Sequence, residues 1–427
     1  MRASVIVLLL CAALAVCGGA AAATDRDSAV TFKPLFDLRV RQEALDGVYY
    51  FAPDPDRNWI RVRTRAGLRT DISRHRLEVR LVNEHRHHLH PADVDFDWDE
   101  LILDRGLWAW RASDKTTLTV GRQDIIWDRG FLMLEGHALD GSRSIYHNAV
   151  RLQTSLGPGD LDLALIHNPK QDPIVLAGDQ DRNLTDADET AVAVRLDRGV
   201  QKWSLIWKDE DDPDGRLAHL STVTGAGRFD FGLGEATGLL AEIALQYQDG
   251  NDAGWYDREP DAGQSAGWAV ALQTFLTGDL GWRTSSEVGF FFYSGRDGNL
   301  LPFRAPWGRW PKWSELYIYS LIGESTPGRI NVAAWENVAA PRLTLRRPLT
   351  GWLNARLGAS YLLAPEPAWE ARGVLLQTEL KFELTAGLKA HLLWEMLAPG
   401  SFHDGRHGLA PLTDTVHFLR WQLSYAL

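Results

Sequence analysis

The ten residues Ile60-Arg61-Val62-Arg63-Thr64-Arg65-Ala66-Gly67-Leu68-Arg69 alternate between arginines and small or apolar side chains. Successive residues of a β-strand point to opposite faces of the sheet, so a spacing of two places all these arginines on one face. In an α-helix the same spacing would distribute them around the circumference. The stretch therefore predicts a strand, either of a soluble sheet with its arginines in water or of a membrane barrel with its arginines in the lumen.

Segments with this period of two, bounded by turn residues, recur along the chain and predict about eighteen strands, with sixteen as the alternative. They lie at Phe32–Glu43, Trp59–Thr70, Arg74–Arg86, Trp98–Arg111, Thr116–Ile125, Asn148–Leu156, Leu161–His167, Thr190–Asp197, Lys202–Lys208, Leu217–Thr224, Leu239–Gln248, Gly267–Thr277, Gly281–Tyr293, Ala340–Arg347, Trp352–Leu363, Val374–Leu384, Leu388–Leu397 and Thr415–Leu427.

The connections between these segments alternate in length. Short turns are predicted at 71–73, 112–115, 157–159, 198–200, 278–279, 348–351 and 385–387. Long polar loops are predicted at 44–58, 87–97, 126–147, 168–189, 209–216, 249–266, 294–339, 364–373 and 398–414. Short turns at one rim and long loops at the other are typical of outer-membrane barrels. We therefore predict an all-β fold, a closed antiparallel transmembrane β-barrel, over the alternative of a soluble all-β domain.

The aromatic content fits this prediction. The chain has 18 Trp, 10 Tyr and 15 Phe, and outer-membrane barrels carry aromatic girdles at both interfaces. The girdle candidates are Trp59, Trp203, Trp268, Trp282 and Trp352 near strand beginnings, and Tyr247, Tyr361 and Trp394 nearer the ends.

The N-terminus predicts export. An apolar run from Val5 to Val16 is followed by small residues ending at Ala23, which is the pattern of a cleaved signal peptide spanning 1–23. Lipidation at Cys17 is the alternative. A single barrel domain would then span 24–427. Both cysteines, Cys11 and Cys17, lie in the removed segment, so no disulfide or cysteine metal site is expected. No later apolar run is long enough for a transmembrane helix, and the expected location is the outer membrane of a Gram-negative bacterium.

The charges favour an anionic ligand but exclude nucleic acid. Without Arg2 the mature chain has 44 basic and 56 acidic side chains, a formal charge of −12. Of the 45 basic residues 37 are Arg, whose planar fork pairs with carboxylates in a two-pronged manner. A GC-rich genome would produce the same bias.

Eleven arginines lie opposite an apolar strand face, and an arginine facing lipid would cost about 2 to 4 kcal/mol at mid-membrane. They are predicted to line the pore and to bind the solute: Arg39, Arg41, Arg61, Arg63, Arg65, Arg69, Arg76, Arg80, Arg122, Arg151 and Arg195. They form either an anion-conducting track or a structural ladder neutralised by inward carboxylates such as Asp37, Glu43, Glu78, Glu100 and Asp104. We expect a mixture with a net positive band.

Two long loops bear on the pore. The loop at 126–147 either folds inward as a constriction or lies on the surface. The loop at 294–339 interleaves Trp307, Trp310 and Trp313 with Arg304, Arg309 and Lys312. Because aromatics among cations stack on sugars and hold acidic groups, it is either an outer saccharide contact or a collar facing lipopolysaccharide.

Other reactive patterns are weak. The acidic stretches at 179–189 and 209–215 do not have EF-hand spacing, and His85, His87, His88 and His90 lack a defined ligand set, so no metal and no cofactor is expected. Gly263-Gln264-Ser265-Ala266-Gly267 matches a nucleophile elbow formally, but a strand rather than a helix is predicted to follow it. We therefore predict no catalytic residue and no enzyme.

Three short segments resemble the alginate-export family of outer-membrane porins. They are Gly121-Arg122-Gln123 at a strand end, Asn148-Ala149-Val150-Arg151-Leu152 on the next strand, and Leu393–Phe402 running into a Pro-Gly loop. The resemblance implies a barrel that passively exports an alginate-like acidic exopolysaccharide, with periplasmic export partners. The alternatives are a porin for uptake of small anionic nutrients and, with less support, an outer-membrane hydrolase. Lipid and lipopolysaccharide are the other expected partners, and a monomer is expected.

Overall fold

The computed structural model of this protein describes residues 30–48, 54–92, 101–134, 147–178, 185, 187–214, 219–251, 264–295, 300–307, 314–316, 337–366, 368–403 and 412–427. The strands are β1 (Val30–Asp46), β2 (Arg57–Ile72), β3 (His75–His90), β4 (Leu101–Arg111), β5 (Thr116–Gln123), β6 (His147–Leu156), β7 (Gly159–Asn168), β8 (Val175–Ala177), β9 (Asp188–Arg198), β10 (Gln201–Asp211), β11 (Leu220–Gly232), β12 (Gly238–Asn251), β13 (Gln264–Asp279), β14 (Ser285–Tyr293), β15 (Val338–Pro348), β16 (Leu353–Ala364), β17 (Glu370–Thr385), β18 (Leu388–Pro399) and β19 (Val416–Ala426). A short 3-10 helix, η1, spans Ser401–His403.

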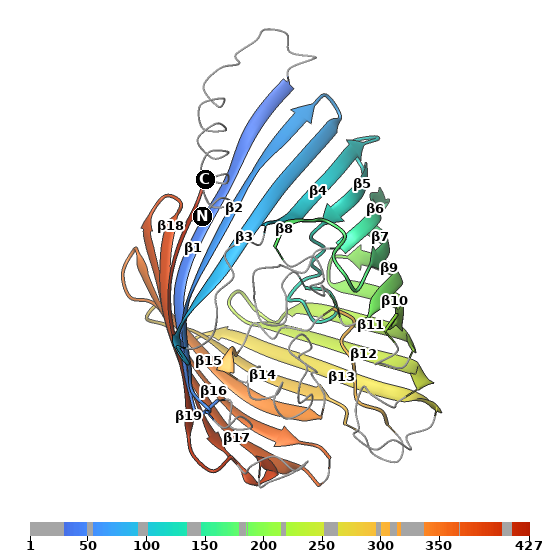
Figure 1. Cartoon of the computed structure of the whole chain (residues 1–427). Coiled ribbons are helices and arrows are strands. Elements are labelled where there is room, and N and C mark those ends of the chain that lie inside the picture. Colours follow the sequence, from blue (N-terminus) through green and yellow to red (C-terminus); the bar gives the residue numbers. More distant parts are fainter. Residues whose placement is uncertain are drawn as a thin grey trace.

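All strands except β8 form one closed ring of eighteen antiparallel strands (Figure 1). Each strand pairs with the next one along the chain, β7 pairs with β9, and β1 closes the ring by pairing with β19 from Asp37↔Ala426 to Asp46↔His417. Closure leaves no lipid-facing edge of unpaired backbone groups. The predicted fold class, an antiparallel barrel of about eighteen strands, is confirmed.

The strands form because polar and apolar residues alternate, and β12 shows the pattern most clearly. Its residues Ile243, Leu245 and Tyr247 are exposed on the outer surface, while Glu242, Ala244, Gln246 and Gln248 between them are buried. The same alternation places Leu77 and Val79 of β3 outside. Lipid solvates the outer apolar face, and the inward face of β12 contacts segments that fold into the barrel.

The two rims differ as predicted. Turns of a few residues join β2 to β3, β4 to β5, β6 to β7 and the later pairs up to β17 and β18, whereas the connections at the other rim are longer. The connection between β14 and β15 runs from Ser294 to Asn337. Long-loop and short-turn rims are used below as names for these two ends of the barrel.

The sequence pattern does not predict strand β8, which completes the sheet where β5 stops. After Gln123 the chain leaves the wall, so the edge of β4 near Leu101 loses its neighbour. Part of the predicted loop 168–189 fills this gap, because Ala177 pairs with Leu101 and Val175 with Ile102. An uncovered edge would leave backbone groups unpaired.

Three other details differ from the prediction. Strand β11 continues to Gly232, eight residues beyond the predicted end, because its glycine-rich stretch stays extended. Strand β14 begins at Ser285, since Gly281, Trp282 and Arg283 adopt positive φ angles in the turn before it. Trp59, predicted for a girdle, points inward instead and donates its indole N–H to Glu43 Oε2 at 2.7 Å. No helix among the described residues is long and apolar enough to cross a membrane.

Candidate functional site: an arginine wall and the segments facing it

The inner face of β1–β4 carries several neighbouring groups of ion pairs, which we together call the arginine wall. Its members are nine arginines, Arg39, Arg41, Arg61, Arg63, Arg65, Arg69, Arg76, Arg80 and Arg105, and six carboxylates, Asp37, Glu43, Asp71, Glu78, Glu84 and Asp104. The strand register makes this arrangement necessary, because Arg39 lies opposite Arg63 and Arg41 opposite Arg61. Like charges directly across a ladder repel each other, and carboxylates placed between them relieve the repulsion.

The part of the wall nearer the long-loop rim is closed to solvent. Glu43 lies 3.3 Å from Arg41 Nε, 3.3 Å from Arg61 and 3.5 Å from Arg420 of β19. Glu84 accepts hydrogen bonds from Arg61 Nε at 3.0 Å and from Arg39 at 2.9 Å. All these side chains are buried, so their charges interact through a medium of low polarity.

The part nearer the short-turn rim is more accessible. Asp104 pairs with Arg65 at 3.1 Å and Arg80 at 2.8 Å. Asp71 pairs with Arg69 at 2.7 Å and with Arg76 at 3.0 Å, and the side chains of these two arginines are 30% and 38% exposed. Exposure of the wall therefore increases towards the short-turn rim.

The wall has a surplus of positive charge, since its nine arginines pair with six carboxylates on β1–β4 and with one more, Asp124, which follows β5. A low-dielectric surface lined by charge of one sign concentrates ions of the other sign near it. The structure thus combines the two arrangements that the sequence left open, a neutralised ladder and a net positive band. Of the carboxylates proposed from sequence, Asp37, Glu43, Glu78 and Asp104 are partners here, and Glu100 lies outside the described residues.

The three remaining predicted arginines lie apart from this wall: Arg122 and Arg195 hold inward-folded segments in place, and Arg151 joins two neighbouring strands. Arg122 of β5 binds Asp172 at 2.9 Å and the Leu103 carbonyl at 2.6 Å, which positions the chain before β8. Arg151 pairs with Asp162, and Arg195 pairs with Asp128 at 2.6 Å. Arg122 is 2% exposed. Its predicted role in binding solute has no support in this arrangement.

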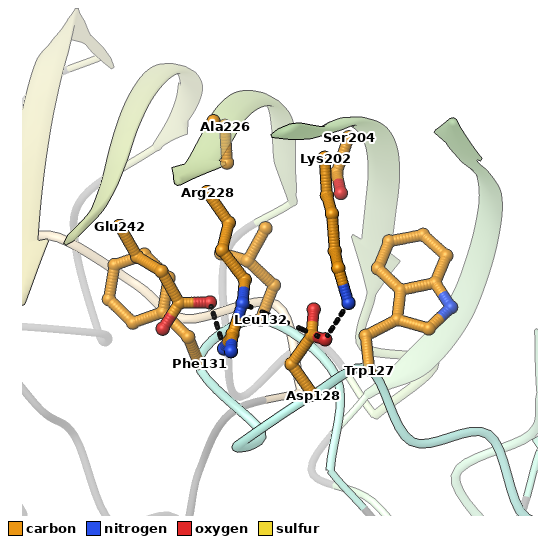
Figure 2. A pocket seen from close by; sticks show the side chains of 10 residues that line it. Trp127, Asp128, Phe131, Leu132, Lys202, Ser204, Ala226, Arg228 and Glu242 are labelled. Atoms are coloured by element: carbon orange, nitrogen blue, oxygen red, sulfur yellow. Dashed lines mark hydrogen bonds and ion pairs between the residues drawn. The ribbon is translucent and has the colours of Figure 1, made fainter. Parts of the chain in front are cut away.

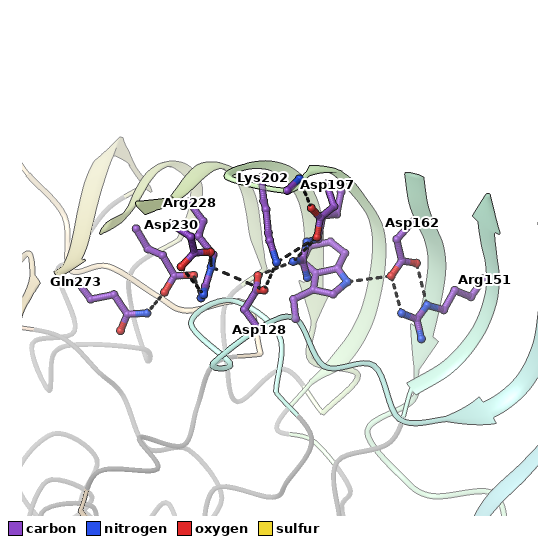
Figure 3. A network of polar contacts seen from close by, with 12 residues as sticks. Asp128, Arg151, Asp162, Asp197, Lys202, Arg228, Asp230 and Gln273 are labelled. Carbon is purple, nitrogen blue, oxygen red and sulfur yellow. Dashed lines mark hydrogen bonds and ion pairs between the residues drawn. The ribbon is translucent and has the colours of Figure 1, made fainter. Parts of the chain in front are cut away.

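Part of the predicted loop 126–147 folds into the barrel, in favour of the constriction and against the surface alternative. Residues 124–134, the first inward segment, lie against the inner face of the barrel wall (Figures 2 and 3). Trp127 Nε1 donates to Asp162 of β7 at 3.2 Å, and Arg129 binds Glu287 of β14 at 3.0 Å while stacking on Phe275 of β13. The segment therefore runs along the inner face of the barrel from β7 to β14.

Asp128 is the ionic centre of this segment. It lies 2.6 Å from Arg195 of β9, 2.8 Å from Lys202 of β10 and 3.8 Å from Arg228 of β11. Figure 3 shows its carboxylate between Lys202 and Arg228. Beside it a small pocket is lined by Trp127, Phe131, Leu132, Ser204 and Glu242, among others (Figure 2).

Residues 300–307, the second inward segment, cover the same half of the barrel nearer the long-loop rim. The carbonyl of Pro302 accepts a hydrogen bond from Gln248 of β12 at 2.7 Å, and that of Pro306 accepts one from Lys208 of β10 at 3.1 Å. The two segments touch where the backbone N–H of Trp307 donates to the backbone carbonyl of Leu132 at 2.9 Å. They share one apolar core that also includes Phe131 and Phe303.

Trp307 itself takes neither of the two roles proposed for its loop. It is 1% exposed inside the barrel and donates its indole N–H to Glu189 of β9 at 2.9 Å. A tryptophan buried with a satisfied N–H contacts neither an external saccharide nor lipopolysaccharide. Trp310, Trp313, Arg309 and Lys312 lie outside the described residues.

The same loop reaches the opposite wall. Leu316 N donates to Glu395 of β18 at 2.7 Å, whereas Trp307 is bound to β9. Nine steps from strand to strand separate β9 from β18 in either direction around the ring, so these contacts lie on opposite sides. Among the described residues, the two inward segments contact strands β7 to β14, and the arginine wall lies on β1–β4 across the ring.

Sequence reasoning missed several residues of the site. Arg420 follows the alternation of the last strand, so its parity would have placed it inward. Asp128, Lys202 and Arg228 come together only through the fold, because the partners of Asp128 lie on three strands. Within the described ranges no cluster of His, Cys, Asp and Glu could hold a metal ion.

Comparison with known proteins identifies the fold. No protein-family model and no curated protein sequence matches this chain. Among solved structures, OccAB1 of Acinetobacter baumannii is similar with a TM-score of 0.59 at 11% identity, over 93% of this chain and 96% of the other. The outer membrane protein OpdK of Pseudomonas aeruginosa has a TM-score of 0.56 at 11% identity, covering 93% and 98%. OccK2 (OpdF) of P. aeruginosa, in complex with glucuronate, has a TM-score of 0.57 at 12% identity, covering 93% and 98%.

These comparisons show that the fold is that of an outer-membrane porin, and that the chain belongs in the outer membrane of a Gram-negative bacterium. They also show that the alginate-export assignment is wrong, because these similar structures are Occ and Opd proteins. The motifs behind that assignment have local structural roles. Gln123, for example, donates to the backbone carbonyls of Gly121 and Ala149, which fixes the end of β5.

Proposed function

We propose that this protein is an outer-membrane channel for the uptake of small organic anions that carry a carboxylate. The observation that carries the proposal is the surplus of arginines on β1–β4, placed across the ring from the strands that the two inward segments contact. The guanidinium group binds carboxylates in a two-pronged geometry. A row of arginines already paired with carboxylates offers a solute many exchangeable contacts and no single deep trap.

The likeness in fold to the glucuronate complex of OccK2 supports this choice of solute class. Glucuronate has one carboxylate on a neutral sugar ring, and such a molecule could move from arginine to arginine along the wall.

The experiment is conductance in a planar bilayer, with the reversal potential in a salt gradient and with block by glucuronate. The test variant replaces Arg63, Arg69 and Arg76 with Gln. Their partners Asp37 and Asp71 have side chains 27% and 34% exposed, so the substitutions leave no buried charge unpaired. We expect anion preference and glucuronate block in the wild type, and a loss of both in the variant.

The matched control replaces Arg198, Arg283 and Arg347 with Gln. These residues are exposed and lie near the short-turn rim, so this variant loses the same charge away from the arginine wall. Its selectivity should stay close to that of the wild type. Cation preference in the wild type, or equal effects of the two triple variants, would refute the proposed function.

A further inference from the structure

Residues 314–316 are fixed to the barrel wall at a single carboxylate. Glu395 Oε2 of β18 accepts hydrogen bonds from Ser314 Oγ at 2.9 Å, Glu315 N at 2.8 Å and Leu316 N at 2.7 Å. Leu316 is fully buried and Ser314 is 2% exposed. The backbone of this short segment is therefore held independently of the side chain of Glu315.

That side chain faces the arginines. Glu315 Oε1 lies 2.9 Å from Arg420 of β19, whose side chain is 8% exposed. Arg420 also lies 3.5 Å from Glu43, and Glu43 is in turn paired with Arg41 and Arg61. Through Arg420, a carboxylate from a loop thus joins the closed end of the arginine wall.

The local charges explain why a carboxylate is stable there. Arg39, Arg41, Arg61 and Arg420 pair with two carboxylates on the described strands, Glu43 and Glu84. Glu315 provides a third negative charge to these four positive ones. Unlike Glu43 and Glu84, it belongs to the loop between β14 and β15 and not to the barrel wall.

We propose that Glu315 occupies a binding site for a solute carboxylate, and that a permeating carboxylate replaces it at Arg420. The site consists of Arg420 backed by Arg41 and Arg61, and its ligand is a small molecule with one carboxylate. The replacement exchanges one ion pair of Arg420 for another, so the buried guanidinium is not left unpaired. This inference rests on the proposed function. It adds that a solute carboxylate gains access to the closed end of the arginine wall by displacing Glu315 from Arg420.

The test is the variant Glu315→Gln, studied by glucuronate block of single channels. Glutamine keeps the size of the side chain, and the backbone N–H groups that bind Glu395 are unchanged. The variant lacks the Glu315 carboxylate that competes with glucuronate for Arg420. The half-blocking concentration of glucuronate should therefore fall about tenfold. Glucose, which has no carboxylate, should give the same response in both proteins. Glu366→Gln, which removes a charge from the loop between β16 and β17, should leave the half-blocking concentration unchanged.

A double-mutant cycle separates competition from a merely structural role. In the Arg420→Gln background the substitution of Glu315 should have no further effect on block, because both act through the same guanidinium. Correct folding of each variant is checked by its heat-dependent migration on gels. If glucuronate blocks the wild type but Glu315→Gln leaves the half-blocking concentration unchanged or raises it, this inference is refuted and the proposed function stands. If glucuronate does not block the wild type at all, the proposed function fails first.

Discussion

Lys202 Nζ of β10 lies 2.8 Å from Asp128 Oδ1, although 74 positions separate the two residues in the sequence. This contact ties the first inward segment to the barrel wall, and Arg195 and Arg228 hold the same carboxylate from the strands on either side. The position of this segment inside the barrel therefore depends on ion pairs and not on the strand ladder alone.

Asp128→Asn should release the first inward segment. It leaves three cations facing a neutral amide, which costs about 3 kcal/mol for partly buried pairs. We expect a higher single-channel conductance with larger current fluctuations. Asp230→Asn is the control, since Asp230 pairs with Arg228 at 2.7 Å but lies on strand β11 and not on the inward segment. Equal conductance in Asp128→Asn and wild type would show that the apolar contacts of Phe131 and Leu132 suffice.

Glu43→Gln should destabilise the barrel strongly. The carboxylate is fully buried and has three arginines within 3.5 Å, so its loss leaves buried positive charges without compensation. A cost of about 3–5 kcal/mol is expected. Unfolding by urea in lipid vesicles measures it. Asp37→Asn, at a partly exposed pair with Arg63, should cost at most about 1 kcal/mol, and similar losses in the two variants would contradict this account.

Gly121→Ala should weaken the hairpin of β4 and β5. Gly121 has a φ of 115°, and a Cβ there would lie 2.3 Å from the Gly106 carbonyl oxygen. The strain should cost about 1–3 kcal/mol or more. Gly157 has a φ of 65° with nothing within 4 Å of an added Cβ, so Gly157→Ala should cost only about 1 kcal/mol. Thermal unfolding in detergent compares the two, and an equal loss would argue against a special role of Gly121.

Leu245→Arg tests the lipid-facing surface. Leu245 is 51% exposed in the middle of β12, where an arginine should cost about 2–4 kcal/mol. The control is Leu233→Arg in the turn after β11, with an expected cost of about 0–1 kcal/mol near the interface. The free energy of unfolding in vesicles distinguishes them. A tolerated arginine at position 245 would contradict the assignment of this face to lipid.

Lys170 should link two loops of the long-loop rim over a wide pH range. It pairs with Asp212 and lies 2.7 Å from Asp214. Burial lowers the pKa of Lys170, but the hydrogen bonds with the two carboxylates outweigh it, so that its pKa lies above the usual value. A raised pKa means that the stabilisation is complete below the ordinary lysine pKa of about 10.5 and is lost as the pH rises through the raised pKa of the folded protein. Limited proteolysis should show loops equally protected from pH 6 to pH 9, and Lys170→Met should abolish that protection.

Much of the fold could be predicted from sequence because polar and apolar residues alternate regularly along a strand that faces lipid on one side. Each of the eighteen predicted segments overlaps one strand of the ring, and the alternation within β2 is enough to place its arginines on the inward face. Failures occur where the period breaks. Strand β8 has only three residues, too few to show a period, and glycines in β11 hide the alternation that continues to Gly232.

The site could be predicted only in part. The strand pattern shows which face an arginine takes, but not which carboxylate reaches it from a distant strand or loop. Arg122 and Arg63 look alike in sequence, yet one holds a loop through Asp172 and the other belongs to the arginine wall. The inward position of Trp307 depends on Glu189 and Leu132, neither of which is near it in the chain.

The seam between β1 and β19 has a consequence for how the protein is made. Ion pairs of the arginine wall cross this seam, because Arg420 on the strand nearest the C-terminus binds Glu43 on the first strand. During synthesis residue 420 is added almost 380 positions after Glu43, so the buried carboxylate stays without this partner until β19 has been made. Pairing of β1 with β19 and formation of the Arg420–Glu43 ion pair are thus a single event, and a chain that lacks β19 can neither close the barrel in the bilayer nor complete this ion-pair cluster.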